Sequence, residues 1–262
     1  MNCKNNQKTS DLGLRRGLTT LGAMLALAFA APAMAGTIDF ESQPPAAYQS
    51  DESITSDGYN LLFVNGPVAQ FFGFASAIGT VLDSADPSSC DVTGCPEGAT
   101  GNYLGILNDG AVKLSRAGQN AWFTVDSLDF AFVAPLPIGP GDFGRLVLSG
   151  ELKDGGTMST MLAFPGQNNA GQFTFGASAL DAAFRGAVFT SLTINACLWD
   201  FAGECSNSLD SNAGNQAQFA IDNVVLNDVP EPGSIALFGL AAGALGLSRR
   251  RAARKAAPSA TI

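Results

Sequence analysis

Short apolar runs broken by turn-forming residues fill the middle of this 262-residue chain, and they constrain its fold more than any other feature. Residues 37–41 alternate apolar and polar side chains, as a strand with one buried face does. No stretch of the middle keeps the 3.6-residue apolar period of an amphipathic helix. Further strand-like runs lie at residues 60–64, 102–107, 121–125, 127–133, 145–152, 157–164, 172–175, 187–194 and 218–226. Many short strands at regular spacing predict an all-β fold, an antiparallel β-sandwich of jelly-roll type.

The clearest local prediction is a β-hairpin. The runs at residues 145–152 and 157–164 flank the segment Lys153-Asp-Gly-Gly156. Glycine supplies the positive φ that a tight return between two strands requires. We therefore expect these two runs to pair directly.

The N-terminus has the parts of a secretory signal peptide. A basic, polar start precedes an apolar run at residues 18–30, and the run ends at Ala33-Met-Ala35. This small-x-small pattern fits the narrow pockets of signal peptidase. We expect cleavage before Gly36, so that residues 1–35 leave the mature chain. An uncleaved anchor helix is the alternative, but the apolar run is short for one.

Residues 36–228 form the predicted domain, which is strongly acidic and contains no histidine. Five basic and 21 acidic residues give it a net charge of −16. Such a surface repels nucleic acid and attracts cations. Without histidine, Ser-His-Asp catalysis, Cys-His catalysis and the HExxH zinc site are excluded. Two carboxylates could still form a glycosidase site, but 21 acids make such pairs common by chance. We expect a protein that is not an enzyme.

Four cysteines lie in the predicted domain: Cys90, Cys95, Cys197 and Cys205. In an exported chain an even number of cysteines indicates two disulfides rather than a metal site. Of the three connectivities, local pairing of Cys90 with Cys95 and of Cys197 with Cys205 is the one we favour. By the loop-entropy argument each small ring would add about 2–2.6 kcal/mol of stability, enough to pin a loop.

Residues 229–262 combine a proline-rich break, an apolar stretch and a basic end. As a helix, residues 233–248 would be about 24 Å long, somewhat less than the hydrocarbon core of a bilayer at about 30 Å. A buried helix at the end of a domain is the alternative, and the basic cluster argues against it. By the positive-inside rule the cluster would stop transfer and stay in the cytoplasm. Its first members are Arg249, Arg250 and Arg251.

Pro230-Glu231-Pro232, the apolar stretch and the arginine cluster together resemble the PEP-CTERM sorting signal of Gram-negative bacteria. The resemblance covers about the last 34 residues. It implies an integral-membrane exosortase that recognises the Pro-Glu-Pro motif and processes the protein on its way to the surface, often alongside exopolysaccharide production. The strand Gln218-Phe-Ala-Ile-Asp222 is similar to the Gln-Phe-x-x-Asp pattern of one PEP-CTERM subgroup.

These features imply a route and a set of partners. The chain would be exported and cut by signal peptidase. It would then be held in the inner membrane by its tail, and reach the cell surface, the extracellular space or a biofilm matrix through an exosortase-like enzyme. Exopolysaccharide is the expected partner there, and nucleic acid is excluded. We expect a structural, adhesive or carbohydrate-binding role. The alternative is a secreted carbohydrate-active enzyme displayed by the same tail.

Two candidate sites lie in the domain. First and last strands of jelly-roll domains commonly pair, which would place Glu41 and Asp39 near Asp222. Carbohydrate-binding domains that this one resembles hold a structural calcium ion there, bound by carboxylate and backbone oxygens. The alternative is that Asp222 accepts hydrogen bonds from a turn while Glu41 is solvated. No cofactor beyond this Ca²⁺ is expected.

The second candidate is a ligand platform. Sugar binding needs exposed aromatic rings that stack on pyranose faces. Trp199 borders the second cysteine loop and is the ligand candidate, with packing against that disulfide as the alternative. Trp122 lies inside a strand-like run and is expected in the core.

Overall fold

The computed structural model describes residues 35–66, 77–86, 94–117, 121–134, 141–199, 202–206 and 217–229, together with residues 239 and 243. Ala33–Val229 forms one compact unit. In the described part of the chain, no helix is both long and apolar enough to cross a membrane. Several predicted features lie outside the described residues: the signal peptide up to residue 34, Cys90, the motif Pro230-Glu231-Pro232, the rest of the tail apart from residues 239 and 243, and Arg249, Arg250 and Arg251.

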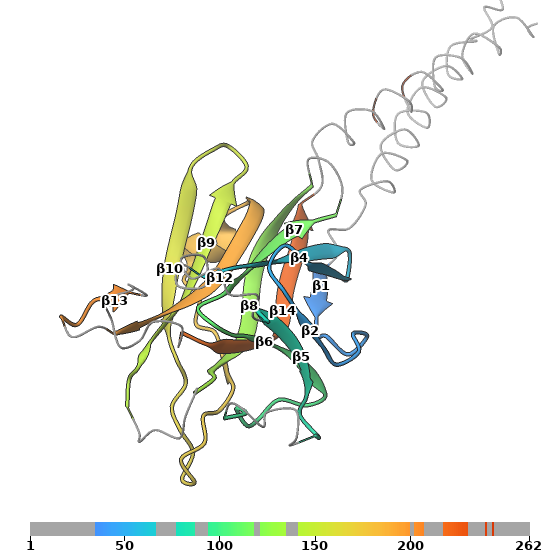
Figure 1. The fold of residues 1–262 in the computed structure, drawn as a ribbon. Coiled ribbons are helices and arrows are strands. Elements are labelled where there is room, and N and C mark those ends of the chain that lie inside the picture. Colours follow the sequence, from blue (N-terminus) through green and yellow to red (C-terminus); the bar gives the residue numbers. More distant parts are fainter. Residues whose placement is uncertain are drawn as a thin grey trace, which may run out of the picture. The chain divides into compact units, whose positions relative to one another are not determined.

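One layer of the domain, the β14 sheet, is centred on the last strand, β14 (Phe219–Val229). The first half of β14 pairs with β6 and the second half with β1, while β8 runs along its other side. All these pairings are antiparallel (Figure 1). The layer contains, in spatial order, β2 (Ala46–Tyr48), β5 (Gly79–Asp83), β6 (Asn102–Ile106) with β1 (Ala35–Ile38), β14, β8 (Trp122–Phe132) and β11 (Gly176–Ala177).

The other layer, the β12 sheet, is centred on β12 (Phe189–Trp199), which has β7 and β9 as its neighbours. Its order is β3 (Ser53–Ser56), β4 (Tyr59–Val64), β7 (Ala111–Arg116), β12, β9 (Gly144–Leu152) and β10 (Thr157–Ala163). The short β13 (Cys205–Ser206) pairs with the end of β12. A single short helix, α3 (Ala182–Gly186), precedes β12 among the described residues.

The two layers meet at one corner. In the described residues β8 pairs with β12 where Phe123 lies opposite Phe189, so the strand path continues from one layer to the other. The result is an antiparallel sandwich that nearly closes into a barrel, which confirms the predicted all-β, antiparallel fold. Closure of this kind reduces the number of free sheet edges.

Buried and partly exposed side chains alternate along the strands, and the buried ones form the core. In β4 the side chains of Tyr59, Leu61 and Phe63 are buried while those between them are partly exposed. In β9 Leu146 and Leu148 point inward in the same way. One apolar cluster fills the space between the layers. Burying each such side chain contributes about 1.5–3 kcal/mol, which makes this cluster the main source of stability.

The predicted hairpin is confirmed. β10 pairs with β9 along its whole length, with Thr157 opposite Glu151 and Ala163 opposite Arg145. Gly155 has φ 90° and the next glycine φ 85°, the left-handed conformations that the turn requires.

Two predicted runs join into one strand, and one strand prediction is wrong. The runs at residues 121–125 and 127–133 form the single strand β8, in which the alternation changes phase at the exposed Asp126. A register shift in β14 accommodates this change opposite β8. Residues 172–175 do not form a strand, because Asn168 folds this loop on itself by accepting hydrogen bonds from the amides of Ala170 and Gln172.

Candidate functional site

The folded domain runs directly into the predicted sorting motif. Asp228 pairs with Phe123, and Val229 pairs with Trp122, the first residue of β8. Strand pairing therefore continues to the residue before Pro230, and no linker separates the sheet from the motif. We call this end of the domain the exit rim, defined by Tyr59, Arg116, Trp122, Asp228 and Val229.

At the exit rim, side chains of two other strands hold Asp228. The Tyr59 hydroxyl donates to Asp228 Oδ1 at 2.8 Å, and Arg116 Nη2 lies 2.7 Å from Oδ2. The Arg116 guanidinium also lies over the Tyr59 ring, 4.9 Å from its centroid. Burial, followed by the hydrogen bond to Asp228, raises the pKa of the Tyr59 hydroxyl. Tyr59 therefore remains a neutral donor at physiological pH, and the end of β14 is fixed in place.

The first strand reaches the same rim. Ala35 lies opposite Asn227 and Gly36 lies opposite Leu226 in the β1–β14 pair. A Cβ added at Gly36 would lie 3.7 Å from Cε2 of Tyr59, so the start of β1 packs against the same tyrosine. The predicted signal-peptidase site and the sorting motif thus leave the domain on neighbouring strands.

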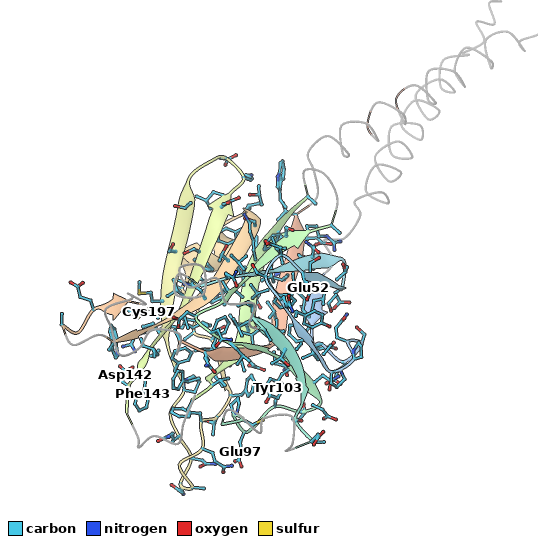
Figure 2. All side chains as sticks on the ribbon, in the orientation of Figure 1. Glu52, Glu97, Tyr103, Asp142, Phe143 and Cys197 are labelled. Atoms are coloured by element: carbon cyan, nitrogen blue, oxygen red, sulfur yellow. A yellow bond between two sulfur atoms is a disulfide. The ribbon has the colours of Figure 1, made fainter. Side chains whose placement is uncertain are left out.

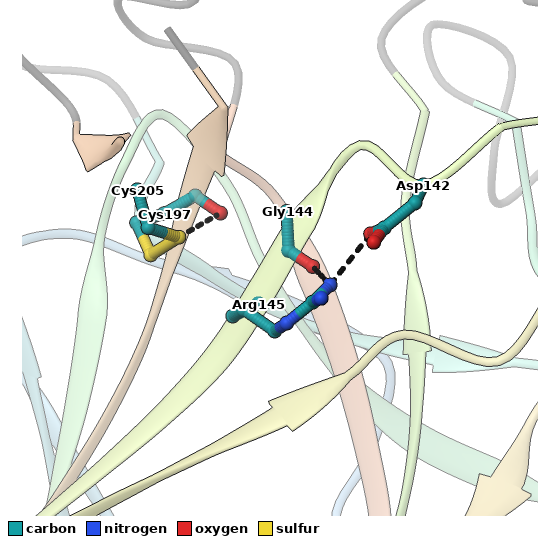
Figure 3. Close-up of a disulfide and its surroundings, with 5 residues drawn as sticks. All are labelled: Asp142, Gly144, Arg145, Cys197 and Cys205. Carbon is teal, nitrogen blue, oxygen red and sulfur yellow. Dashed lines mark hydrogen bonds and ion pairs between the residues drawn. A yellow bond between two sulfur atoms is a disulfide. The ribbon is translucent and has the colours of Figure 1, made fainter. Parts of the chain in front are cut away.

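The disulfide between Cys197 and Cys205 is confirmed (Figure 3). It links the end of β12 to β13 across a sequence separation of 8. Cys95 is also disulfide-bonded, while its predicted partner Cys90 lies outside the described residues. The Tyr103 hydroxyl lies 3.2 Å from Cys95 Sγ, and burial raises the pKa of Tyr103 to about 12.

Trp199, the candidate for sugar binding, lies opposite Cys205 of the Cys197–Cys205 disulfide, and Arg145 stacks on its ring. Arg145 Cζ is 4.6 Å from the ring centroid, and Arg145 Nη1 is 2.6 Å from Asp142 Oδ1. Figures 2 and 3 show Asp142 next to this corner of the domain. The hydrogen bond from Arg145, helped by one from Trp199, lowers the pKa of the Asp142 carboxyl. The guanidinium covers one face of the indole, so a sugar ring cannot stack there.

Asp222 is buried, with 3% of its surface exposed, and it lies among other carboxylates. Its pKa is raised to about 7, chiefly by burial. The amide hydrogen bond from Asn223 lowers the pKa in part, whereas the negative charges of Asp129, Glu41 and Asp39 raise it. The negative charges of Asp39 and Glu41 therefore act on Asp222 in the direction that favours its protonated form.

Backbone and side-chain amide groups donate hydrogen bonds to these carboxylates. Asn223 donates from its backbone to Asp222 Oδ1 at 2.8 Å and from its side chain to Asp129 Oδ2 at 3.0 Å. The Asn102 amide donates to Glu41 Oε1 at 3.1 Å. Across the described ranges, no three acidic or cysteine side chains are placed to share a metal ion. Calcium binding by Asp39, Glu41 and Asp222 therefore stays a prediction.

Sequence reasoning missed the role of Tyr59, Arg116 and Asp228. The small number of basic residues in the domain, five against 21 acids, was a signal that each would have several acids to pair with. Four form ion pairs with acids, and Lys153 lies 5.7 Å from the Trp122 ring centroid. Which acid each would meet depends on the fold.

Comparison with known proteins identifies the tail. A family model described as the PEP-CTERM protein-sorting motif matches residues 228–252. The match begins at Asp228, inside β14. No curated protein matches the chain.

Among solved structures, a single-site mutant of the carbohydrate-binding module CBM29-2 has 12% identity and a TM-score of 0.32, covering 77% of this chain and 99% of that one. A cyclase from Fischerella sp. TAU has 15% identity and a TM-score of 0.34, covering 75% and 98%. The CBM22-1–GH10 modules of a Clostridium thermocellum xylanase have 12% identity and a TM-score of 0.32, covering 71% and 28%. Likenesses this distant do not assign a ligand to this chain.

Proposed function

We propose that this chain, whose residues 228–252 carry a PEP-CTERM protein-sorting motif, is an exported structural or adhesive protein of the cell surface or extracellular matrix. The observation that carries the proposal is the place where the motif begins. Its first two residues, Asp228 and Val229, belong to the last strand of the domain. The matched region therefore includes the end of β14, where Tyr59 and Arg116 hold Asp228 at the exit rim.

The proposed route has three steps. Signal peptidase removes residues 1–35, and the apolar tail then holds the chain in the inner membrane with Arg249–Arg251 on the cytoplasmic side. An exosortase-like enzyme next processes the tail and passes the domain to the surface. The Gln218-to-Asp222 segment places the chain, in our proposal, in the Gln-Phe-x-x-Asp subgroup.

The outer face of the β12 sheet supports association with a neutral polysaccharide. The strand register places Ser149 of β9 between Ser159 of β10 and Thr193 of β12. The Oγ atoms of the two serines lie 2.8 Å apart and share a hydrogen bond. Hydroxyl groups in such a row can donate to and accept from the hydroxyls of a sugar chain. The acidic charge of the domain disfavours an anionic polymer.

The alternative of a carbohydrate-active enzyme has a direct test. The purified protein is incubated with the exopolysaccharide of its host, and reducing ends and bound polymer are both measured. A binder retains the polymer at its original length, whereas release of reducing ends would establish the enzyme and reject our proposal.

The sorting proposal is tested by mass spectrometry of both termini in cell-envelope and culture-supernatant fractions. We expect a start at Gly36 and an end between residues 229 and 233, with no tail peptides. A Glu231→Gln variant should keep the same start but retain its tail in the membrane. An intact tail in the wild-type protein, found only in membranes, would instead leave a plain membrane-anchored protein.

A further inference from the structure

Strand β10 is an open edge of the β12 sheet. It pairs with β9 along all 7 of its residues, and it has no second strand partner among the described residues (Figure 1). On that free side, none of its backbone groups forms a hydrogen bond with another backbone group within the described ranges. A row of unpaired N–H and C=O groups is a template for another strand.

The other edges of the domain are much shorter. In the part of the chain that is described, the remaining strands with a single partner have 4 residues (β1 and β3), 3 (β2) or 2 (β11 and β13). The β3 edge is also bordered by the acidic residues Glu52 and Asp57. Short strands and bordering charges are the usual protection of an edge against pairing. β10 has the length of a pairing strand and lacks that protection.

The composition of β10 also favours pairing. Its sequence, Thr-Met-Ser-Thr-Met-Leu-Ala, contains no charge and no proline. Met161 is 59% exposed, and it is the large hydrophobic side chain that stands out as exposed in the described residues. In a domain with a net charge of −16, an uncharged strand is the place where two copies can approach with least repulsion.

We propose that β10 pairs antiparallel with β10 of a second copy of this chain, so that two β12 sheets join into one. With the two-fold axis at Thr160, Met158 lies opposite Leu162 of the other copy, and Ser159 lies opposite Met161. Met158 and Leu162 both face the core side, so the apolar core would continue from one domain into the next. On the outer side, each Met161 would be covered by the other strand.

The proposed contact is small, because two seven-residue strands bury less than the roughly 1,200 Å² of a stable protein interface. It should be weak between free molecules. Where the sorting route concentrates the domains at a surface, high effective concentration strengthens it. The pairing itself does not depend on sorting, since the unprocessed chain contains the same edge.

The test is sedimentation of the full chain in detergent over a range of concentrations up to about 1 mM. Ser159→Lys with Met161→Lys places lysines opposite lysines at both outer positions, so we expect the association constant to fall at least tenfold. The control makes the same charge change on the other edge of the β12 sheet, Ser53→Lys with Thr55→Lys on β3, whose two side chains are also exposed. The control should associate like the wild type.

A second measurement uses the wild-type chain alone. Amide hydrogen exchange in residues 157–163 should slow as concentration rises, while exchange in β3 stays unchanged. A wild-type chain that is monomeric at about 1 mM, or a folded β10 variant that associates as tightly as the wild type, would overturn the proposal. If the β10 variant does not fold, the concentration dependence of exchange in the wild type decides.

Discussion

Asp222 should make the stability of the domain fall as pH rises from about 4 to about 7. Its folded pKa of about 7 lies well above its ordinary value of 3.8. The folded state therefore holds its proton in a range where the unfolded state has released it. Stability is highest when Asp222 is protonated, and it is lost as pH rises through the folded pKa. At about 1.36 kcal/mol for each pKa unit, the upper limit of the loss is roughly 4 kcal/mol.

The perturbation is Asp222→Asn, which keeps an oxygen to accept from the Asn223 amide and removes the ionisable group. Wild type and variant should be equally stable near pH 4. Near pH 8 the variant should be more stable, by up to about 4 kcal/mol or a urea midpoint about 2 M higher. Asp154→Asn, in the exposed turn between β9 and β10, removes the same charge at a remote place and serves as the control.

Urea unfolding followed by tryptophan fluorescence at a series of pH values measures this difference. Parallel pH profiles for the wild type and Asp222→Asn would refute the reasoning, because they would show that Asp222 does not hold a proton in the folded state. Repeating the series with Ca²⁺ and with a chelator tests the predicted calcium site. An ion bound to ionised Asp222 would stabilise the wild type near pH 8 and leave the variant unchanged.

Three further predictions concern the fold, each measured by urea unfolding. Asp228→Asn should cost about 1–2 kcal/mol, because it weakens the charge-assisted contacts of the exit rim; an unchanged midpoint would contradict this role. Replacing both cysteines of the Cys197–Cys205 disulfide by serine should cost about 2.6 kcal/mol by loop entropy, and a reducing agent should then have no further effect at this loop. Gly150→Ala should cost about 1–3 kcal/mol, because its Cβ would overlap the Phe189 ring, whereas Gly166→Ala, with open space around it, should be neutral.

The antiparallel fold and the β9–β10 hairpin could be predicted because they depend on local patterns. Burial in β4 and β9 alternates from residue to residue as in any strand with one buried face, and the two glycines of the turn have the positive φ that a tight hairpin requires. The jelly-roll topology stays a prediction. The ends of strands were harder to predict from the sequence. β14, for example, extends to Val229 because β8 pairs with it that far.

The exit rim shows why the rest could not be predicted. Tyr59 and Asp228 are 169 residues apart in the sequence, and Arg116 and Asp228 are 112 apart. With 21 acids in the domain, no pattern around Arg116 selects Asp228 as its partner. For Trp199 the sequence left stacking on a sugar and packing against the disulfide both open, whereas the contact with Arg145 depends on the pairing of β9 with β12.

Under the proposed sorting route, the pairing of β1 with β14 would set an order for the two processing steps. A protease binds the bond that it cuts in an extended segment, and in the folded domain the Ala35–Gly36 bond lies in β1, paired with β14. Because β14 is the last strand to be translocated, we expect signal peptidase to act before β1 and β14 pair, and exosortase-like processing to act after. Pulse-chase labelling of a chain truncated before residue 218, which lacks β14, should show N-terminal cleavage at the wild-type rate. Slower cleavage in the truncated chain would mean that signal peptidase acts on the folded domain, and the proposed order would be wrong.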